Sequence, residues 1–471
     1  MAGNKLERLV GSLTGIIALK GDRIAVHDQK RLSEKMDGLI HEAVFGDPES
    51  QAAARWIIRS AAQAVGVRPA SIHDFYMAVG RGDIAATFTV PAINLRMLAY
   101  DSAQAVFRAA RKLDVGALIF EIARSEIGYT DQRPAEYSAA VLAAAVREGF
   151  RGPLFIQGDH FQTSGKKYAA APEAEIKAIR DLILEAVAAG FYNIDIDTST
   201  LVDISKPGLD EQQKLNYEVC ADFTKFIREH EPKGVTISVG GEIGEVGQKN
   251  STPEELDAFM KGYNARRGKL TGISKISIQT GTSHGGVVLP DGTLAKVAID
   301  FNVLRLVGEK ARTAYGMGGA VQHGASTLPE QAFHKFVEAR TCEVHLATAF
   351  QNIIMEHEAV PEDLRQELVE WLKANAADER KPKDTDAQFV YKTRKKAIGP
   401  FKKRFWSLPP EARLAIGTSL EKVFTFLFEQ LNVGGTTAAV KTFVKTPEIH
   451  LPLPAGGAKT AKGESVDGLA D

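Results

Sequence analysis

Residues 84–350 alternate short β-rich apolar runs with longer segments of helical periodicity. Most of the short runs are apolar over nearly their whole length, as in Leu118-Ile119-Phe120, and this pattern is typical of parallel strands buried on both faces. Helical segments lie between them, such as residues 173–189, which end at Gly190. This order of elements predicts an α/β fold built on a parallel sheet.

Eight runs qualify as strands, at residues 85–90, 117–122, 153–157, 193–197, 235–239, 275–279, 319–322 and 342–346. Eight parallel strands with intervening helices predict a closed (β/α)8 TIM barrel. An open, doubly wound sheet is the alternative if one element has been split or merged.

The segments outside the barrel predict a division of the chain into four parts. Residues 1–75 have helical character, with apolar positions at helical spacing over 51–65, and are expected to form a helical N-terminal extension. The catalytic barrel is expected over 76–358 and a helical C-terminal extension over 359–453. Residues 454–471 contain too few apolar side chains to fold alone, which predicts a flexible tail.

Charge and cysteine content exclude several functional classes. The 58 lysines and arginines balance 59 aspartates and glutamates, so net charge gives no reason to expect nucleic acid or a membrane surface as a partner. Two cysteines, Cys220 and Cys342, cannot form a disulfide framework or a thiolate metal cage. The apolar run 13–19 is too short to cross a bilayer. These observations favour a cytoplasmic protein.

Polar side chains collect where the predicted strands end. In a barrel the carboxyl ends of the strands meet on one face, where the active site lies, so residues distant in sequence are expected to form one site. The residues at these positions are Asn94, Asp159, His160, Asp197, Glu242, His284, His323 and His345.

Three of these histidines predict a metal site. The imidazoles of His160, His284 and His323 suit a divalent ion such as Zn²⁺ and leave a position open for substrate. Such an ion polarises a ketone and stabilises an enediolate, while the neighbouring Asp159 moves the proton. The chain is therefore expected to be a metal-dependent lyase or isomerase.

The loops beside these histidines predict the substrate class. Gly285 and Gly324 allow close approach of the backbone to an anion. Gly324-Ala325-Ser326 follows the seventh strand, where many barrels bind phosphate, so a phosphorylated sugar is the expected substrate.

Each residue type also has a purely structural interpretation. Asp159 could cap the next helix, and Asp197 could bond to the backbone at Thr198-Ser199. Glu242 could be a loop carboxylate, and a single histidine such as His345 is often a hydrogen-bonded structural group.

The motifs, in order, resemble the class II (metal-dependent) fructose-bisphosphate aldolases and their tagatose-bisphosphate relatives. Gly158-Asp159-His160 is similar to the family's pair of proton donor and metal ligand. Asp197 resembles the family aspartate that contributes to a second metal position. Gly241-Glu242-Ile243-Gly244 is similar to the family motif that contains the ligand glutamate. Ser283-His284-Gly285 and His323-Gly324-Ala325-Ser326 resemble the remaining metal histidines with their phosphate-holding loops.

Several positions depart from the family pattern. Ala123 stands where the family has a phosphate-contacting serine, and the lysine expected shortly after His284 is missing. The family's Asn-x-Asp-Thr substrate motif reads His345-Leu346-Ala347-Thr348 here. The resemblance therefore implies a conserved metal and proton-transfer apparatus with altered substrate contacts, to which Asn94, His345 and Thr348 are assigned.

Three functions follow from these motifs. The first is reversible retro-aldol cleavage of a ketose (bis)phosphate such as fructose 1,6-bisphosphate. The second is an epimerase or isomerase acting on a sugar phosphate or ketoacid with the same fold. The third, suggested by Gly128-Tyr129-Thr130 and Arg133-Pro134, is a non-catalytic tagatose-bisphosphate aldolase subunit, although the complete ligand set argues against it. The resemblance also implies a homodimer or a larger homo-oligomer.

Overall fold

A closed barrel of parallel strands forms the centre of the computed structural model, which describes residues 2–244, 249–281, 299–326, 328–454 and 469. The predicted (β/α)8 TIM barrel is therefore confirmed. Each barrel strand pairs with the next in chain order, and the last pairs with the first. The strands are β4 (Val90–Asn94), β5 (Ile119–Ala123), β6 (Gly152–Gln162), β7 (Asn193–Asp197), β8 (Ser238–Glu242), β9 (Lys275–Ser277), β10 (Ala320–Gln322) and β11 (Glu343–Leu346).

Two strands lie later in the chain than predicted. The first was expected at 85–90 but is β4, because Pro91, which reads as a strand breaker, is accommodated opposite Val344. The fifth was expected at 235–239 but extends through Gly240 and Gly241 to Glu242. A side chain at Gly240 would lie 2.3 Å from the Asp195 carboxylate, so this strand position excludes any larger residue.

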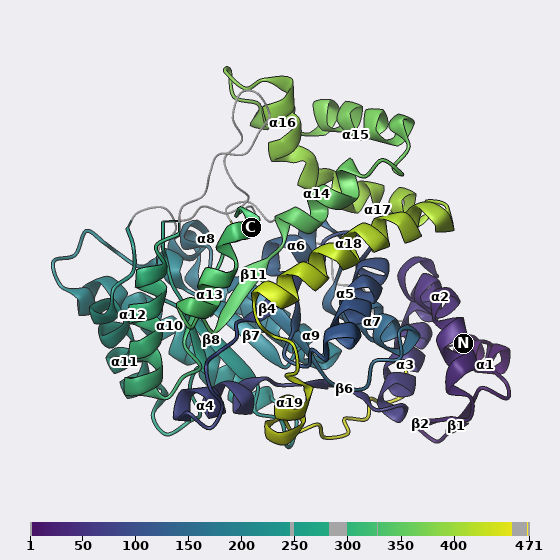
Figure 1. Ribbon diagram of the computed structural model, residues 1–471, viewed down its shortest axis with the longest axis horizontal. Helices are drawn as coiled ribbons and strands as arrows, with labels where there is room; N and C mark the ends of the chain where they lie inside the picture. The colour runs from purple at the N-terminus through teal and green to yellow at the C-terminus, as the bar shows by residue number, and fades with distance from the viewer. Residues whose placement is uncertain (1, 245–248, 282–298, 327, 455–468, 470–471) are drawn as a thin grey trace.

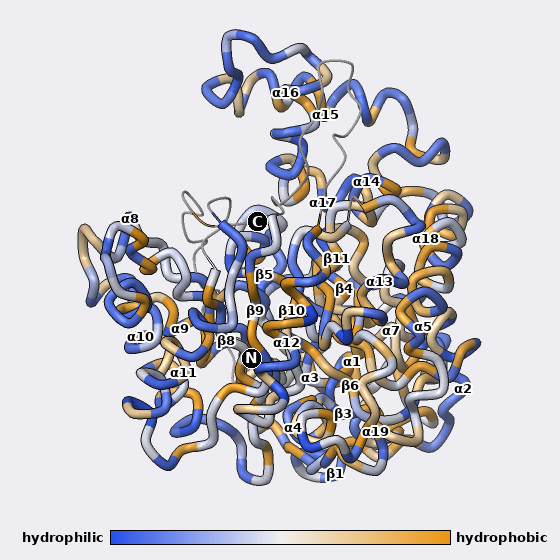
Figure 2. Tube along the Cα trace, turned by 60° about the vertical axis from the view of Figure 1, so that its left-hand side comes forward, coloured by the Kyte–Doolittle hydropathy of each residue, from blue (hydrophilic) through white to orange (hydrophobic). Residues whose placement is uncertain are grey.

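Helices cover the outside of the barrel and connect its strands (Figure 1). Figure 2 shows that the strands form hydrophobic segments inside this shell. The connecting helices are α5 (Ala99–Leu113), α6 (Arg124–Tyr129), α7 (Pro134–Arg147), α8 (Gly165–Ala170), α9 (Pro172–Ala189), α10 (Leu209–His230), α11 (Pro253–Arg267), α12 (Phe301–Tyr315) and α13 (His334–Glu338), and α14 (Thr348–Glu356) follows the last strand.

The N-terminal segment is mostly helical but contains three strands that the sequence did not predict. Its helices are α1 (Ala2–Ser12), α2 (Gln29–Phe45), α3 (Pro48–Ala64) and α4 (His73–Arg81), and its strands are β1 (Ile17–Lys20), β2 (Arg23–Val26) and β3 (Val67–Ala70). The helical character predicted for residues 1–75 is therefore present, and the three short strands are additions to it. The first two strands form a hairpin, and β3 pairs with the beginning of β6.

Asn193 joins β3 to the barrel. Its side-chain amide donates to the carbonyl oxygens of Ala70 and Ile156 at 3.1 and 3.0 Å, and its carbonyl accepts from the Ile72 backbone at 2.9 Å. The backbone register of β3 is therefore specified by a side chain on β7.

The C-terminal segment is helical, with α15 (Glu362–Asn375), α16 (Asp386–Thr393), α17 (Ile398–Trp406), α18 (Pro410–Gln430) and α19 (Thr437–Phe443). In Figure 1, α15 and α16 lie above the barrel end at which α6 and α14 begin. Helix α18 packs along α5, where Arg108 pairs with Glu421 at 2.6 Å and Arg413 with Asp101 at 2.9 Å. The boundaries proposed for the four parts remain predictions.

The segment after α19 contacts the N-terminal extension. Arg68 donates to the Thr446 carbonyl at 3.0 Å, and the Trp56 indole donates to the Leu451 carbonyl at 3.2 Å. Most of the predicted flexible tail lies outside the described residues. No helix in the described parts of the chain is both long and apolar enough to cross a lipid bilayer.

Candidate active site

A β-bulge in β6 places two consecutive side chains inside the barrel. Gly158 pairs with Ile194 and Phe161 with Ile196, so the two residues between them on β6 face one residue on β7. A regular strand would direct Asp159 and His160 to opposite faces. His160 takes a left-handed backbone conformation with φ of 38°, which only a constrained position maintains in a non-glycine residue. The glycine at 158 is required because a side chain there would lie 2.4 Å from the Phe161 ring.

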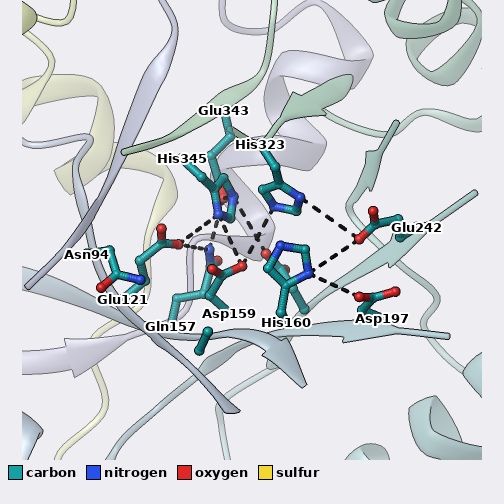
Figure 3. A network of polar contacts seen from close by, with 12 residues as sticks. Asn94, Glu121, Gln157, Asp159, His160, Asp197, Glu242, His323, Glu343 and His345 are labelled. Carbon is teal, nitrogen blue, oxygen red and sulfur yellow. Dashed lines mark hydrogen bonds and ion pairs between the residues drawn. The ribbon is translucent and has the colours of Figure 1, made fainter. Parts of the chain in front are cut away.

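The bulge brings both side chains to His323, which follows β10. The rings of His160 and His323 have centroids 4.1 Å apart, and the Asp159 carboxylate lies 3.7 Å from His323 Nε2. Glu242, the last residue of β8, lies 3.6 Å from His160 Nδ1 and 3.9 Å from His323 Nδ1. Figure 3 shows these side chains converging from separate strands.

His160, Glu242 and His323 fit a divalent metal ion. One ligand atom from each lies within 4.8 Å of the other two, and all three residues are buried. Two ligands of one tetrahedral zinc ion, with bonds of about 2.0–2.2 Å, are separated by roughly 3.4 Å, close to the spacing found here. Two imidazole nitrogens and a carboxylate oxygen are also the donor types that zinc binds.

The electrostatics of the cluster also favour a cation. Burial raises the pKa of Glu242 well above its usual range, and the charge of Asp197 adds to the effect. Burial alone would lower the pKa of His160, but the charge of Asp159 and the bond to Asp197 raise it well above its ordinary value. Without a metal, this part of the site therefore retains protons, which a bound cation would displace.

Asp197, the last residue of β7, bonds to the turn that follows the strand and also contacts His160. Its Oδ1 accepts hydrogen bonds from the Ser199 backbone and hydroxyl at 3.0 and 2.7 Å. Its Oδ2 lies 3.1 Å from His160 Nδ1 and 2.6 Å from the Gln162 amide nitrogen. The turn after the strand thus fixes the carboxylate that contacts His160.

His345 lies on the other side of Asp159, within the same cluster. Its ring centroid is 4.1 Å from that of His323, and its Nδ1 is 3.2 Å from Asp159 Oδ1. Burial alone would raise the pKa of Asp159, but the charges of His160, His345 and His323 hold it well below its usual range. Asp159 is therefore in the carboxylate form, which accepts a proton.

A network of charged and polar side chains lies inside the barrel beside the histidines, and it was not predicted from the sequence. Lys275 Nζ donates to Asp195 at 2.9 Å and to Gln157 at 2.8 Å, and it also contacts Glu343. Gln157 in turn donates to Glu121 and Glu343, both at 3.0 Å. Single charged residues at inward positions of otherwise apolar strands, as in Phe120-Glu121-Ile122, were the available sequence signal.

The predicted substrate-contacting residues lie at the same end of the barrel. Asn94 ends β4 and donates to the Glu126 carboxylate at 2.5 Å. Ser326 Oγ accepts from the Ala347 backbone at 2.6 Å, and Gly324 has a φ of 70° that favours glycine. Ala325 and Thr348 are buried, the latter at the start of α14. His284 and Gly285 lie outside the described residues.

Comparisons with known proteins assign the chain to a family. A family profile described as fructose-bisphosphate aldolase class-II matches residues 84–403, more than half of the chain. A search of curated protein sequences found no match.

Comparisons with solved structures also found similar chains. The glycerol complex of the fructuronate-tagaturonate epimerase from Cohnella laeviribosi is 12% identical, with 81% of this chain and 86% of that chain covered and a TM-score of 0.54. The fructose-bisphosphate aldolase from Campylobacter jejuni is 17% identical, with 78% and 96% covered and a TM-score of 0.45. The YdjI aldolase from Escherichia coli K12 is 14% identical, with 72% and 98% covered and a TM-score of 0.39.

Proposed function

The chain belongs to the class II fructose-bisphosphate aldolase family, and on this premise we propose that it catalyses metal-dependent, reversible retro-aldol cleavage of a ketose phosphate. The observation that supports the proposal most directly is the convergence of His160, Glu242 and His323 around one position, with the Asp159 carboxylate beside them. The fold alone is shared by enzymes of many activities, so the proposal depends on this site.

We assign the metal position to His160, His323 and Glu242, joined by His284 from outside the described residues, and a second metal position to Asp197. Zn²⁺ is the proposed ion because imidazole and carboxylate donors suit it. When bound, the ion supplies a Lewis acid that polarises the ketose carbonyl.

Asp159 is the proposed proton-transfer residue. In the cleavage direction it accepts the proton of the substrate hydroxyl adjacent to the carbon–carbon bond that breaks, and in the synthetic direction it returns that proton. Its position supports the first role, because the carboxylate lies 3.7 Å from Nε2 of His323, beside the proposed metal position. Its burial supports both roles, because bulk water then competes less for the proton.

The substrate phosphate is proposed to bind at Gly324, Ala325 and Ser326, together with Gly285. The positive φ of Gly324 lets the backbone turn close to an anion. Asn94 and Thr348 are proposed substrate contacts because they lie at the barrel end that carries the metal site.

Epimerisation or isomerisation of a sugar phosphate or ketoacid is the second candidate. Three family positions that contact substrate are changed, to Ala123, His345 and Ala347, whereas the metal and proton-transfer residues are retained. A different substrate, handled without breaking a carbon–carbon bond, would be consistent with that pattern.

Product analysis tests both candidates. Metal-loaded protein is incubated with fructose 1,6-bisphosphate, tagatose 1,6-bisphosphate and a panel of ketoacids, and the products are identified by NMR. Release of triose phosphate that stops on chelation supports the aldolase, whereas an epimer without triose supports the second candidate. A pure preparation that binds no divalent metal and has no activity contradicts both and supports the accessory subunit.

The cytoplasm is the proposed location and a homodimer or larger homo-oligomer the proposed assembly. A phosphorylated sugar is the proposed ligand, with neither nucleic acid nor a membrane as a partner. Light scattering on the purified protein measures the assembly directly.

A further inference from the structure

The carboxylate of Asp159 is contacted by histidine rings. Its nearest nitrogen neighbours are Nδ1 of His345 at 3.2 Å and Nε2 of His323 at 3.7 Å. His323 belongs to the proposed metal position of His160, Glu242 and His323, whereas His345 lies outside that group of three. A carboxylate that transfers a proton must be held in one orientation, and the bond that carries it can rotate unless other groups fix it.

The ring of His345 is held on both sides by acidic residues. Nε2 lies 2.6 Å from Glu343 Oε1, and Nδ1 lies 3.0 Å from Glu121 Oε2 (Figure 3). The side chain is 5% exposed. Both ring nitrogens therefore face carboxylates, which leaves little of the ring for the direct substrate contact that the sequence suggested.

Glu343 is in turn fixed by donors from three different elements. Tyr76 of α4 donates to Oε2, while Lys275 of β9 and Gln157 of β6 donate to Oε1. These donors hold Glu343 in one arrangement, because displacing any of them would leave an unpaired charge or dipole in the barrel. The network therefore specifies where His345 lies.

We propose that His345 is a positioning residue, which holds the Asp159 carboxylate in the orientation needed for proton transfer and is itself held by Glu343. This inference rests on the proposed function, in which Asp159 moves the proton. Its physical basis is that the histidine ring links a network in the barrel interior to the Asp159 carboxylate, to which Nδ1 of His345 lies nearer than Nε2 of His323.

The test is a double-mutant cycle on carbon–carbon bond cleavage. His345→Ala, Asp159→Ala and the double variant are loaded with Zn²⁺ and assayed with fructose 1,6-bisphosphate and tagatose 1,6-bisphosphate, and the bisphosphate that the wild type cleaves is used for comparison. Misplacement of a catalytic group by about 1 Å lowers rates by about 100-fold, so His345→Ala should lower kcat by about that factor with little change in KM. In the Asp159→Ala background, His345→Ala should cause no further loss.

Two further variants separate positioning from folding. His345→Gln retains an amide donor near Asp159 and should recover about 10-fold of the lost kcat. His334→Gln changes a half-exposed histidine on α13 and is the matched control, expected to match the wild type. Bound Zn²⁺, measured by mass spectrometry, should be unchanged in all of them.

The other possible results would contradict the proposed function, the positioning role of His345, or both. A wild type that releases no triose overturns the proposed function and the inference together. An active wild type with a kcat for His345→Ala within 3-fold of normal overturns the inference alone, as does an equal loss in both backgrounds. Loss of Zn²⁺ from His345→Ala and His345→Gln would identify the ring as a ligand instead.

Discussion

Glu242 Oε2 lies 3.6 Å from Nδ1 of His160, although the two residues come from strands separated by β7. The barrel makes this approach possible because β6 and β8 both direct their carboxyl ends to the same opening. The bulge in β6 then turns His160 sideways toward β8, and the metal position depends on this local distortion as much as on the fold.

Replacing Asp159 should separate metal binding from catalysis. Asp159→Ala is expected to retain bound metal while kcat falls by about 10²–10⁴-fold, the usual contribution of a positioned acid or base. Metal analysis and steady-state kinetics on the same preparation check this. Asp203→Ala, at an exposed position of the loop after β7, is the control and should be fully active.

Replacing Glu242 should abolish metal binding without destabilising the metal-free protein. Its raised pKa, caused by burial and by the charge of Asp197, shows that the ionised group is unfavourable there until a cation binds. Glu242→Gln should therefore melt at the same temperature as the metal-free wild type or higher. Added Zn²⁺ should raise the melting temperature of the wild type only. Equal stabilisation of both proteins by Zn²⁺ would exclude this glutamate as a ligand.

Lys275 should be one of the most sensitive positions for stability. Removing its charge leaves the buried Asp195 and Glu343 carboxylates without their cation, at a cost of about 3–5 kcal/mol for Lys275→Met. Lys310→Met breaks the partly exposed pair with Asp257, which is 2.8 Å long, and should cost about 1 kcal/mol or less. Urea unfolding of the two variants gives the comparison, and equal losses would contradict the proposed role of the buried network.

His73, the first residue of α4, should make the fold sensitive to acid. Burial, with the charge of Arg228, lowers its pKa from 6.5 to about 4, so the unfolded chain binds a proton in this range and the folded chain does not. The stability that the folded chain gains from keeping His73 neutral is complete above pH 6.5. It is lost as the pH falls from 6.5 toward 4. Proton linkage then lowers the free energy of unfolding by about 2 kcal/mol between about pH 7.5 and pH 5.

The measurement for this histidine compares the wild type with His73→Phe by urea unfolding at both pH values. Because other groups also titrate, the relevant quantity is the difference between the two proteins. The wild type should lose about 2 kcal/mol more than the variant on acidification. Equal decreases in the free energy of unfolding of the two proteins would show that His73 is protonated in the folded state.

The sequence predicted the barrel because apolar runs and helical periods are local signals. The run 193–197 matches β7 at both ends. The strand positions of Pro91 and of the glycines of β8 were not predicted, because their fit depends on partners such as Val344 and Asp195, which are distant in sequence. Strand β3 was missed for the same reason, since it pairs with the far β6.

The candidate site was predictable where reactive residues end strands. Asp159, His160 and Glu242 were found in this way, and the structure brings them together with His323. The charged network around Lys275 was not found, because a single charged residue within an apolar strand indicates an inward position but not the buried acidic partners that it meets. The bulge was equally unpredictable, since it is defined only by the pairing of β6 with β7.

That extra residue in β6 also determines which kinds of change the strand can tolerate. Asp159 and His160 share the interior only because two residues occupy the space of one. Deleting a single residue from this stretch would restore regular alternation and turn one of the two side chains to the outside of the barrel. Within this family member, the length of the strand is therefore as much a part of the chemistry as the identity of the residues in it.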